Sequence, residues 1–169
     1  MKFTRAIEYD ASTAEVYAMV TSPVFQRHKC QVSGALKHWV DMSGSDLPVV
    51  TVCRTVATDG FPDAFRSLLG TTLEVTETYR WHSDARHTAP SAEMTVSIGD
   101  FPVGLAAEVT LRPVGDGTEM VIDGDLTARI PLLGGKVEKA AAPALEDAIA
   151  SEHEAGLLWL TSDGSPVGS

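Results

Sequence analysis

The sequence predicts an α+β fold: one antiparallel sheet of seven strands, one long C-terminal helix, and two short helices after the first strand. Two observations lead to this prediction. Apolar and polar residues alternate in seven segments between residues 2 and 128, which is the period of a strand with one buried face. The segment from Leu132 to Thr161 instead gathers its apolar residues on one side when turned by about 100° per residue, as an amphipathic helix does. We therefore expect the sheet to be arranged around this helix.

Length and composition place the chain among ordinary globular proteins. With 169 residues, 44% apolar and 21% charged, it has enough residues for one substantial core, so we expect one domain over residues 1–161 and a flexible tail over 162–169. The formal charge of −10 repels phosphate backbones, which argues against a nucleic-acid partner. Only the local cluster Arg27, His28 and Lys29 is expected to be able to contact a single phosphate.

The chain carries no targeting or cofactor signal. No apolar run approaches the roughly 20 residues of a membrane helix, and the first residues have no signal-peptide core. We expect a cytoplasmic protein without stable membrane insertion. The two cysteines, Cys30 and Cys53, are predicted to be reduced thiols in or near the core, and the spacing of Cys30 from His28 is no metal motif without further ligands. We expect no metal and no cofactor.

The first strand is predicted over Lys2 to Asp10, with Phe3, Ile7 and Tyr9 on its apolar face and Arg5 on the same parity. Two helices are expected next. Ser12 and Glu15 have the spacing of a capping box at a helix start. Pro23 follows in the first turn of a second helix, where proline is tolerated.

A hairpin is predicted next, with strands over residues 36–42 and 50–56 that turn through Ser43 to Asp46. This pairing would place His38 opposite Val52 and diagonal to Arg54. The connection over residues 59–70 contains a predicted helical turn at 64–69 with an apolar side, formed by Phe61, Phe65, Leu68 and Leu69.

Residues 72–82 alternate cleanly, and Glu77 is the one charged member of their apolar set. Three more strands are expected before the long helix, separated by turn-rich connections.

Pro143 lies inside the helical segment and removes a backbone hydrogen bond. We expect it to bend the helix or to divide it into a short first piece and a main piece.

This order of elements, the run from Phe3 to Pro23 and the run from Ile130 to Glu138 resemble the START-like helix-grip superfamily, also called SRPBCC, over about residues 2–161. Within it, the chain is most similar to an uncharacterised branch known from actinobacterial-type genomes. The resemblance implies a curved sheet wrapped around the long helix, with a hydrophobic cavity between them that holds lipids, sterols or polyketides. Some members of the superfamily are carriers, some are aromatases or cyclases, and some bind protein partners.

Five ionisable side chains share the inward parity in this arrangement: Arg5, His38, Arg54, Glu77 and Glu152. Arg54 and Glu77 lie on successive strands and are interpreted as a buried ion pair, because a guanidinium suits a carboxylate bidentately. The alternative is that Arg54 or Arg5 anchors a ligand carboxylate or phosphate.

Glu152 lies inside the apolar stripe of the long helix, where an unpaired carboxylate is costly to bury. It is expected at the edge of the stripe, extended to solvent, or paired with an arginine of the sheet. If it is desolvated instead, its pKa should rise, and a carboxylic acid facing His38 could transfer protons as a cyclase requires.

We therefore expect a protein that binds a hydrophobic small molecule, lipid or polyketide-like, and that exists as a monomer or weak homodimer. The residues predicted to contact the ligand are His38, Arg54, Glu77, Tyr79, Met94, Leu105, Leu145, Glu152 and Trp159. Two alternatives remain open. One is a cyclase or aromatase that uses Glu152, Glu77, His38 or Tyr79 for acid–base chemistry, and the other is an interaction module whose core is full.

Overall fold

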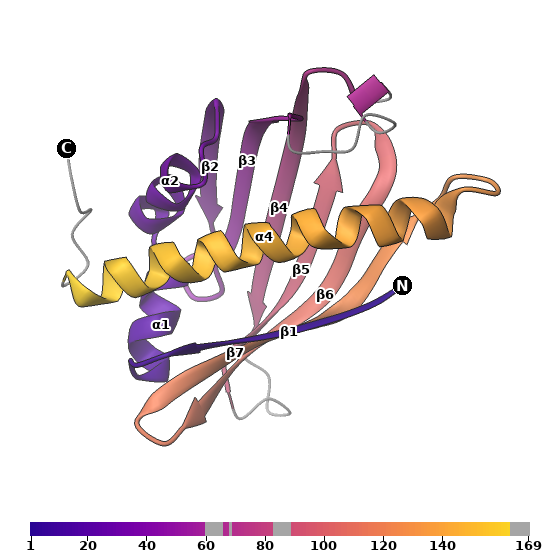
Figure 1. Ribbon diagram of the computed structural model, residues 1–169. Coiled ribbons are helices and arrows are strands. Elements are labelled where there is room, and N and C mark those ends of the chain that lie inside the picture. The colour runs from indigo at the N-terminus through magenta and orange to yellow at the C-terminus, as the bar shows by residue number, and fades with distance from the viewer. Residues whose placement is uncertain (60–65, 68, 83–88, 163–169) are drawn as a thin grey trace.

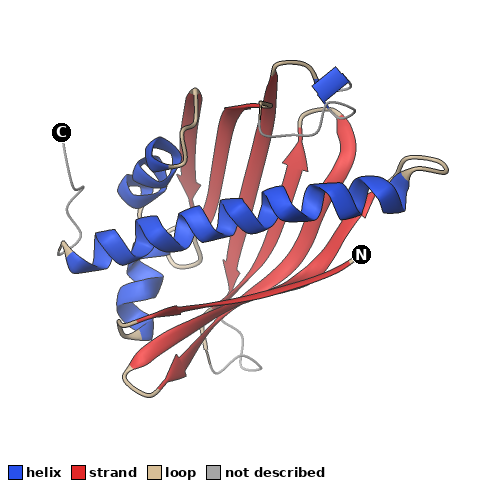
Figure 2. Cartoon of the chain, in the orientation of Figure 1, coloured by secondary structure: helices blue, strands red, loops and turns tan. Residues whose placement is uncertain are grey.

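The computed structural model describes residues 1–59, 66–67, 69–82 and 89–162. Its strands alternate in burial as the sequence predicts, and the predicted α+β class and order of elements are confirmed (Figure 2). The strands and helices are, in chain order, β1 (Lys2–Tyr9), α1 (Thr13–Val20), α2 (Pro23–Val32), β2 (Lys37–Ser43), β3 (Val49–Ala57), β4 (Thr72–His82), β5 (Ser91–Ile98), β6 (Phe101–Val114), β7 (Gly117–Ala128) and α4 (Gly134–Thr161).

The seven strands form one antiparallel sheet in the order β1-β7-β6-β5-β4-β3-β2. Strands from β2 to β7 each pair with the next along the chain, whereas β1 closes the other edge by pairing with β7, from Lys2 opposite Asp125 to Tyr9 opposite Thr118. Figure 1 shows the curved sheet with α4 lying across its inner face and α1 and α2 at one end. Helix α4 contacts β1 and β7 of the sheet and both short helices.

The two short helices begin where the sequence predicts. Ser12 accepts a hydrogen bond from the backbone N–H of Glu15, and the Glu15 carboxylate accepts one from the Ser12 N–H, so the predicted capping box is confirmed. Pro23 is in the first turn of α2, with Ser22 as its cap. The side chain of Gln26 then donates to the carbonyl of Val20 at 2.7 Å, which fixes α2 relative to α1.

Helix α4 is one helix, so the expectation that Pro143 divides it into two pieces is wrong. Pro143 is exposed, as is Lys139 one turn earlier, so water can solvate the carbonyl that the proline leaves without a partner. The start of the helix is tied to the sheet through Glu138, whose carboxylate accepts from the Ala128 N–H at 3.0 Å and from the N-terminal ammonium at 3.2 Å.

The C-terminal half of α4 approaches the sheet closely because its side chains there are small. A Cβ atom at Gly156 would lie 2.8 Å from the Tyr9 ring and 3.1 Å from the Met19 methyl carbon. Ala155 is fully buried beside it. The small residues therefore allow close packing in this half of the helix.

The predicted pairing of the β2–β3 hairpin is wrong by two residues. His38 lies opposite Arg54, and Val40 lies opposite Val52. The reason is the length of the connection, because Leu47 and Pro48 belong to it and Ser43 pairs with Val49. His38 is consequently a direct neighbour of Arg54 across the two strands.

The two cysteines are buried and free, as predicted. Among the residues that the structure describes, no helix is both long enough and apolar enough to cross a bilayer. The predicted helical turn at 64–69, with Phe61, Phe65 and Leu68, falls mostly outside the described residues, as does the predicted tail after residue 162.

Candidate functional site

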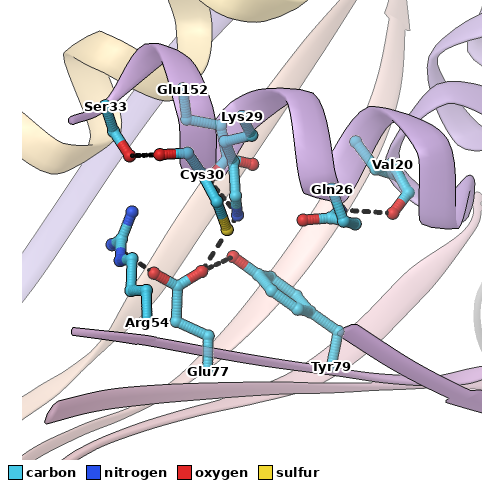
Figure 3. A network of polar contacts seen from close by, with 9 residues as sticks. All are labelled: Val20, Gln26, Lys29, Cys30, Ser33, Arg54, Glu77, Tyr79 and Glu152. Atoms are coloured by element: carbon cyan, nitrogen blue, oxygen red, sulfur yellow. Dashed lines mark hydrogen bonds and ion pairs between the residues drawn. The ribbon is translucent and has the colours of Figure 1, made fainter. Parts of the chain in front are cut away.

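Four charged side chains meet between the sheet and two helices, and we call them the charged cluster: Lys29 of α2, Arg54 of β3, Glu77 of β4 and Glu152 of α4. Lys29 Nζ donates to Glu77 Oε2 at 3.0 Å and to Glu152 Oε2 at 3.1 Å. Arg54 Nη2 donates to the other oxygen of Glu77. Figure 3 shows the Glu77 carboxylate between the two cations, with the Tyr79 hydroxyl beside it.

The charged cluster is shielded from solvent. The exposed fraction of the side chain is 1% for Lys29, 5% for Glu77, 9% for Arg54 and 13% for Glu152. Removing charges from water costs several kcal/mol per ion, and here two positive charges offset two negative ones. The Tyr79 hydroxyl adds a hydrogen bond to Glu77 at 3.4 Å, and Lys29 Nζ lies 5.6 Å from the centre of the Tyr79 ring.

The partners of Glu77, Lys29 and Arg54 shift the pKa values of these three groups toward their ionised forms. Burial alone raises the pKa of the Glu77 carboxyl, but the adjacent Lys29 and Arg54 cations outweigh it and lower that pKa to about 2. For Lys29 and Arg54, burial acts to lower the pKa, and the nearby carboxylates raise it above the ordinary value. Burial also raises the pKa of Tyr79 well above its ordinary value.

The position of Lys29 follows from how α2 packs. Phe25, one turn earlier, is fully buried, and its ring makes an edge contact with Trp159 of α4 at a centroid distance of 5.5 Å. Cys30, the residue after Lys29, is fully buried as well. The face of α2 that carries Phe25 and Lys29 is therefore held against the sheet and α4, where the lysine reaches two carboxylates.

Lys29 was not predicted to belong to the site; with Arg27 and His28 it was expected to form a local cluster able to contact a phosphate. Lys29 is 1% exposed and His28 is 9% exposed, so that expectation is wrong. The available signal was the helical spacing of Lys29 from Phe25 and Gln26, which puts a cation on the apolar side of a short helix. That signal alone names no partner, because both carboxylates are distant in sequence.

Of the residues predicted to form the site, the structure brings together Arg54, Glu77, Tyr79 and Glu152. The predicted ion pair between Arg54 and Glu77 is confirmed. Glu152 pairs with Lys29 from α2 and not with an arginine of the sheet.

The other predicted site residues lie around the charged cluster or apart from it. His38 is half-buried beside Arg54, Leu145 is half-buried on α4, and Met94, Leu105 and Trp159 are buried in the apolar core. The prediction that Arg5 points into the enclosed space is wrong, because its side chain is 46% exposed and lies 4.0 Å from Glu146. Arg5 is on the edge strand β1, where the side chain can extend past the helix.

The inner face of the sheet changes character along its strands. At the end near α1, most of its apolar residues are at most 7% exposed; they are Val50, Val52, Tyr79, Trp81, Ala92, Met94, Val109, Leu111 and Met120. Val40 and Met42, on the edge strand β2, are half-buried. Toward the other end, six apolar residues are only half-buried, and we call them the open half: Val56, Val75, Val96, Ile98, Phe101 and Val103. Leu73 and Leu105 remain buried among them.

Helix α4 shows the same change. Its buried residues are Ile149, Ala155, Gly156 and Trp159, all in the C-terminal half. The residues that face inward before them are half-buried, and they include Val137, Ala141, Leu145 and Ala148. Arg54 and Glu77 lie between the buried and the half-buried groups on β3 and β4, and Glu152 lies among the buried residues of α4, between Ile149 and Ala155. On the sheet, the charged cluster therefore lies at the boundary between the buried residues and the open half.

Two shallow hollows elsewhere do not involve the charged cluster. One, of about 270 Å³, lies where β1 meets the β6–β7 turn, near Tyr9 and Asp116. The other, of about 420 Å³, lies over β5, β6 and β7, near Thr95 and Asp123. Among the residues that are described, no group of three His, Cys, Asp or Glu side chains is placed to hold a metal ion.

Comparison with solved structures places this geometry in a known fold. The ZhuI aromatase/cyclase from Streptomyces sp. R1128 superimposes with a TM-score of 0.64 at 13% identity, over 100% of this chain and 98% of that one. A START superfamily protein from Mycobacterium smegmatis gives 0.58 at 16% identity, over 94% and 98% of the two chains. At these identities the similarity establishes the START-like fold and not the activity.

Sequence relatives are closer in identity. Uncharacterised proteins of Mycobacterium tuberculosis (Rv0481c) and Mycobacterium bovis (Mb0491c) are each 28% identical over 125 residues, which cover 72% of this chain and 71% of theirs. A family model described as "Protein of unknown function (DUF2505)" matches residues 4–160, nearly the whole START-like fold. The chain therefore belongs to the DUF2505 family.

Proposed function

We propose that the protein binds an apolar small molecule between the open half of the sheet and the N-terminal half of α4. The observation that carries this proposal is the change in burial along the strands. A sheet that only needed a core would bury its inner face from end to end, yet the valines and Phe101 of the open half keep accessible apolar surface inside the curve. A bound apolar molecule would remove that surface from water.

The chemistry of the surrounding residues suits such a ligand. Binding sites for small molecules are mainly apolar, with a few placed polar groups that fix orientation. Here the open half supplies the apolar wall, and Arg54 and His38 lie at its inner end. In this half the inward residues of α4 include small, half-buried ones such as Ala141 and Ala144, whereas Gly156 packs closely against Tyr9 in the other half.

Glu77, Lys29 and Tyr79 are poorly suited to acid–base catalysis. A general acid or base works best with a pKa near the operating pH. The pKa of Glu77 is about 2, and the pKa values of Lys29 and Tyr79 are raised above values that are already high. These three groups therefore keep their protonation states at neutral pH and act as fixed charges and donors.

The fold neighbours support the proposal at the level of the fold. Norcoclaurine synthase from Thalictrum flavum, with a TM-score of 0.58 at 15% identity, was solved in complex with dopamine and hydroxybenzaldehyde. A protein of this shape can therefore enclose small organic molecules. The aromatase/cyclase and the synthase are enzymes by name, but the ionised cluster of this chain gives no reason to assign it either reaction.

Native mass spectrometry of the protein purified from its own host tests the proposal, with N-phenyl-1-naphthylamine as a neutral apolar fluorescent probe. We expect a stoichiometric apolar molecule in the native spectrum, or saturable probe binding after extraction. Val96→Trp fills the open half and should weaken probe binding by about tenfold or more. Thr95→Trp, on the exposed face of the same strand, is the matched control and should leave binding unchanged. A clean apo mass together with no saturable probe binding would contradict the proposal.

A further inference from the structure

Arg54 has hydrogen-bond donors that the protein leaves unused. A guanidinium carries five N–H donors, and within the described part of the chain only Nη2 has a partner, the carboxylate of Glu77. The Nε atom is buried with no partner there, and Nη1 makes no hydrogen bond there. Figure 3 shows Glu77 at one side of the Arg54 guanidinium, and the other side of the guanidinium points away from Glu77. A buried donor without an acceptor costs roughly 1–3 kcal/mol, so an acceptor is expected to reach it.

Arg54 lies where a molecule bound in the open half could supply that acceptor. On the inner face of β3, Arg54 lies between Val52, which is fully buried, and Val56, which is half-buried. His38 lies directly opposite on β2, half-buried and without a hydrogen-bond partner in the described structure. The guanidinium is thus at the inner end of the open half, where the end of a bound apolar molecule would arrive.

The charges nearby say which kind of acceptor fits. The charged cluster already balances two cations, Lys29 and Arg54, with two anions, Glu77 and Glu152. A ligand carboxylate or phosphate would add a further buried anion, repelled by both glutamates and matched by no additional buried cation of the cluster. A carbonyl oxygen accepts hydrogen bonds without adding charge.

We infer that the ligand is an apolar molecule whose polar end is a neutral carbonyl oxygen, as in a ketone or an ester, and that Arg54 donates to this oxygen. This inference rests on the proposed binding function. It differs from the expectation that Arg54 anchors a ligand carboxylate or phosphate. The positive charge of Arg54 is already paired with Glu77, so Arg54 can offer a ligand its remaining N–H donors but no unpaired charge.

The test compares three probes of equal chain length at pH 7.5 by calorimetry or native mass spectrometry: 2-decanone, decanoate and 1-decene. We expect 2-decanone to bind about tenfold more tightly than either of the others. Carbon-13 labelling of the ketone carbonyl gives a direct second readout. Its infrared stretch in the complex should lie at lower frequency than in an apolar solvent such as hexane, because the bound carbonyl accepts a hydrogen bond.

Arg54→Lys keeps the charge that pairs with Glu77 but loses the planar fork that serves two acceptors at once. We expect this variant to lose the carbonyl shift and the preference for the ketone while still binding 1-decene. Arg80→Lys, on the exposed side of β4, is the matched control. If Arg54→Lys does not fold, the wild-type comparison and the infrared shift decide alone.

The possible outcomes distinguish a failure of this inference from a failure of the proposed binding function. Equal binding of all three probes, with no carbonyl shift, leaves the binding function standing and overturns the inference. Preference for decanoate also overturns it, in favour of an anion site. If none of the three probes binds, the proposed function itself fails and the inference falls with it.

Discussion

The ammonium group of Lys29 lies 3.1 Å from Oε2 of Glu152, so an ion pair joins α2 to α4 at a point where the lysine side chain is 1% exposed. The same ammonium group binds Glu77 on the sheet. One side chain therefore connects the short helix, the long helix and the sheet.

Replacing Lys29 by methionine leaves Glu77 and Glu152 buried with Arg54 as the only cation of the cluster. We expect the free energy of unfolding to fall by about 3–5 kcal/mol, the usual cost of breaking a buried pair from one side. Glu152→Gln removes the negative charge of the second carboxylate. The double variant Lys29→Met with Glu152→Gln should therefore lose less unfolding free energy than the sum of the losses of the two single variants. Urea denaturation of the four proteins of this cycle measures the coupling.

The exposed pair of Lys2 and Asp125, whose nitrogen and oxygen lie 2.9 Å apart with side chains 81% and 51% exposed, is the control for this cycle. Its coupling should be much smaller, because water and salt screen it. A coupling for Lys29 and Glu152 no larger than that of the exposed pair would show that burial adds nothing to their interaction.

Glu77 makes stability depend on acidic pH. Its pKa is lowered from 4.5 to about 2 in the folded protein, so its contribution is fully present above pH 4.5 and is lost as the pH falls toward 2. The contribution is on the order of 3 kcal/mol. Chemical denaturation of the wild type between pH 6 and pH 2.5 should show the unfolding free energy falling with pH through this window.

Glu77→Gln cannot take up this proton, so its pH slope in the same window should be smaller by up to roughly 1.4 kcal/mol per pH unit. Glu74→Gln, on the exposed face of the same strand, should keep the wild-type slope more closely. Parallel slopes for wild type and Glu77→Gln would mean that the carboxyl is not held ionised by its partners.

Gly156 and Gly135 lie in the same helix, and replacing each by alanine should change the stability of the protein in opposite directions. Gly156→Ala puts a methyl group 2.8 Å from the ring of Tyr9, which is 1% exposed and has no room to move. We expect a loss of about 1–3 kcal/mol from overpacking. Gly135 has nothing within 4 Å of its Cβ position, so Gly135→Ala should instead raise stability by a few tenths to about 1 kcal/mol, because alanine favours the helix. Thermal unfolding of the two variants provides the comparison, and a stabilised Gly156→Ala would argue against close packing at this point.

Local patterns predicted which segments form strands and helices, because burial of one face imposes a period that can be counted along the chain. The capping box of Ser12 and Glu15 is a contact over three residues, so it was predictable as well. Even the ion pair of Arg54 and Glu77 followed from parity, since both interrupt the apolar faces of successive strands. These features depend on residues that are close in sequence or on neighbouring strands.

Other features depended on the length of a loop or on contacts between distant segments. The pairing of His38 with Arg54 required knowing how many residues the β2–β3 connection takes up. The burial of Lys29 required knowing that α2 packs against α4, more than a hundred residues later, through Phe25 and Trp159.

The periods counted along the chain were enough to predict the α+β class, the order of the elements and, with Arg5 as an exception, the apolar and charged residues of the inner face. The packing of α2 and α4 on the sheet determined that a lysine of α2 completes the charged cluster and that part of the inner face is only half-buried. Alternation along the sequence indicates which side of a strand is apolar. How deeply that side is buried depends on which elements pack against it. Here α4 closes tightly at Gly156 and leaves Val96 and Ile98 half-buried toward its other end.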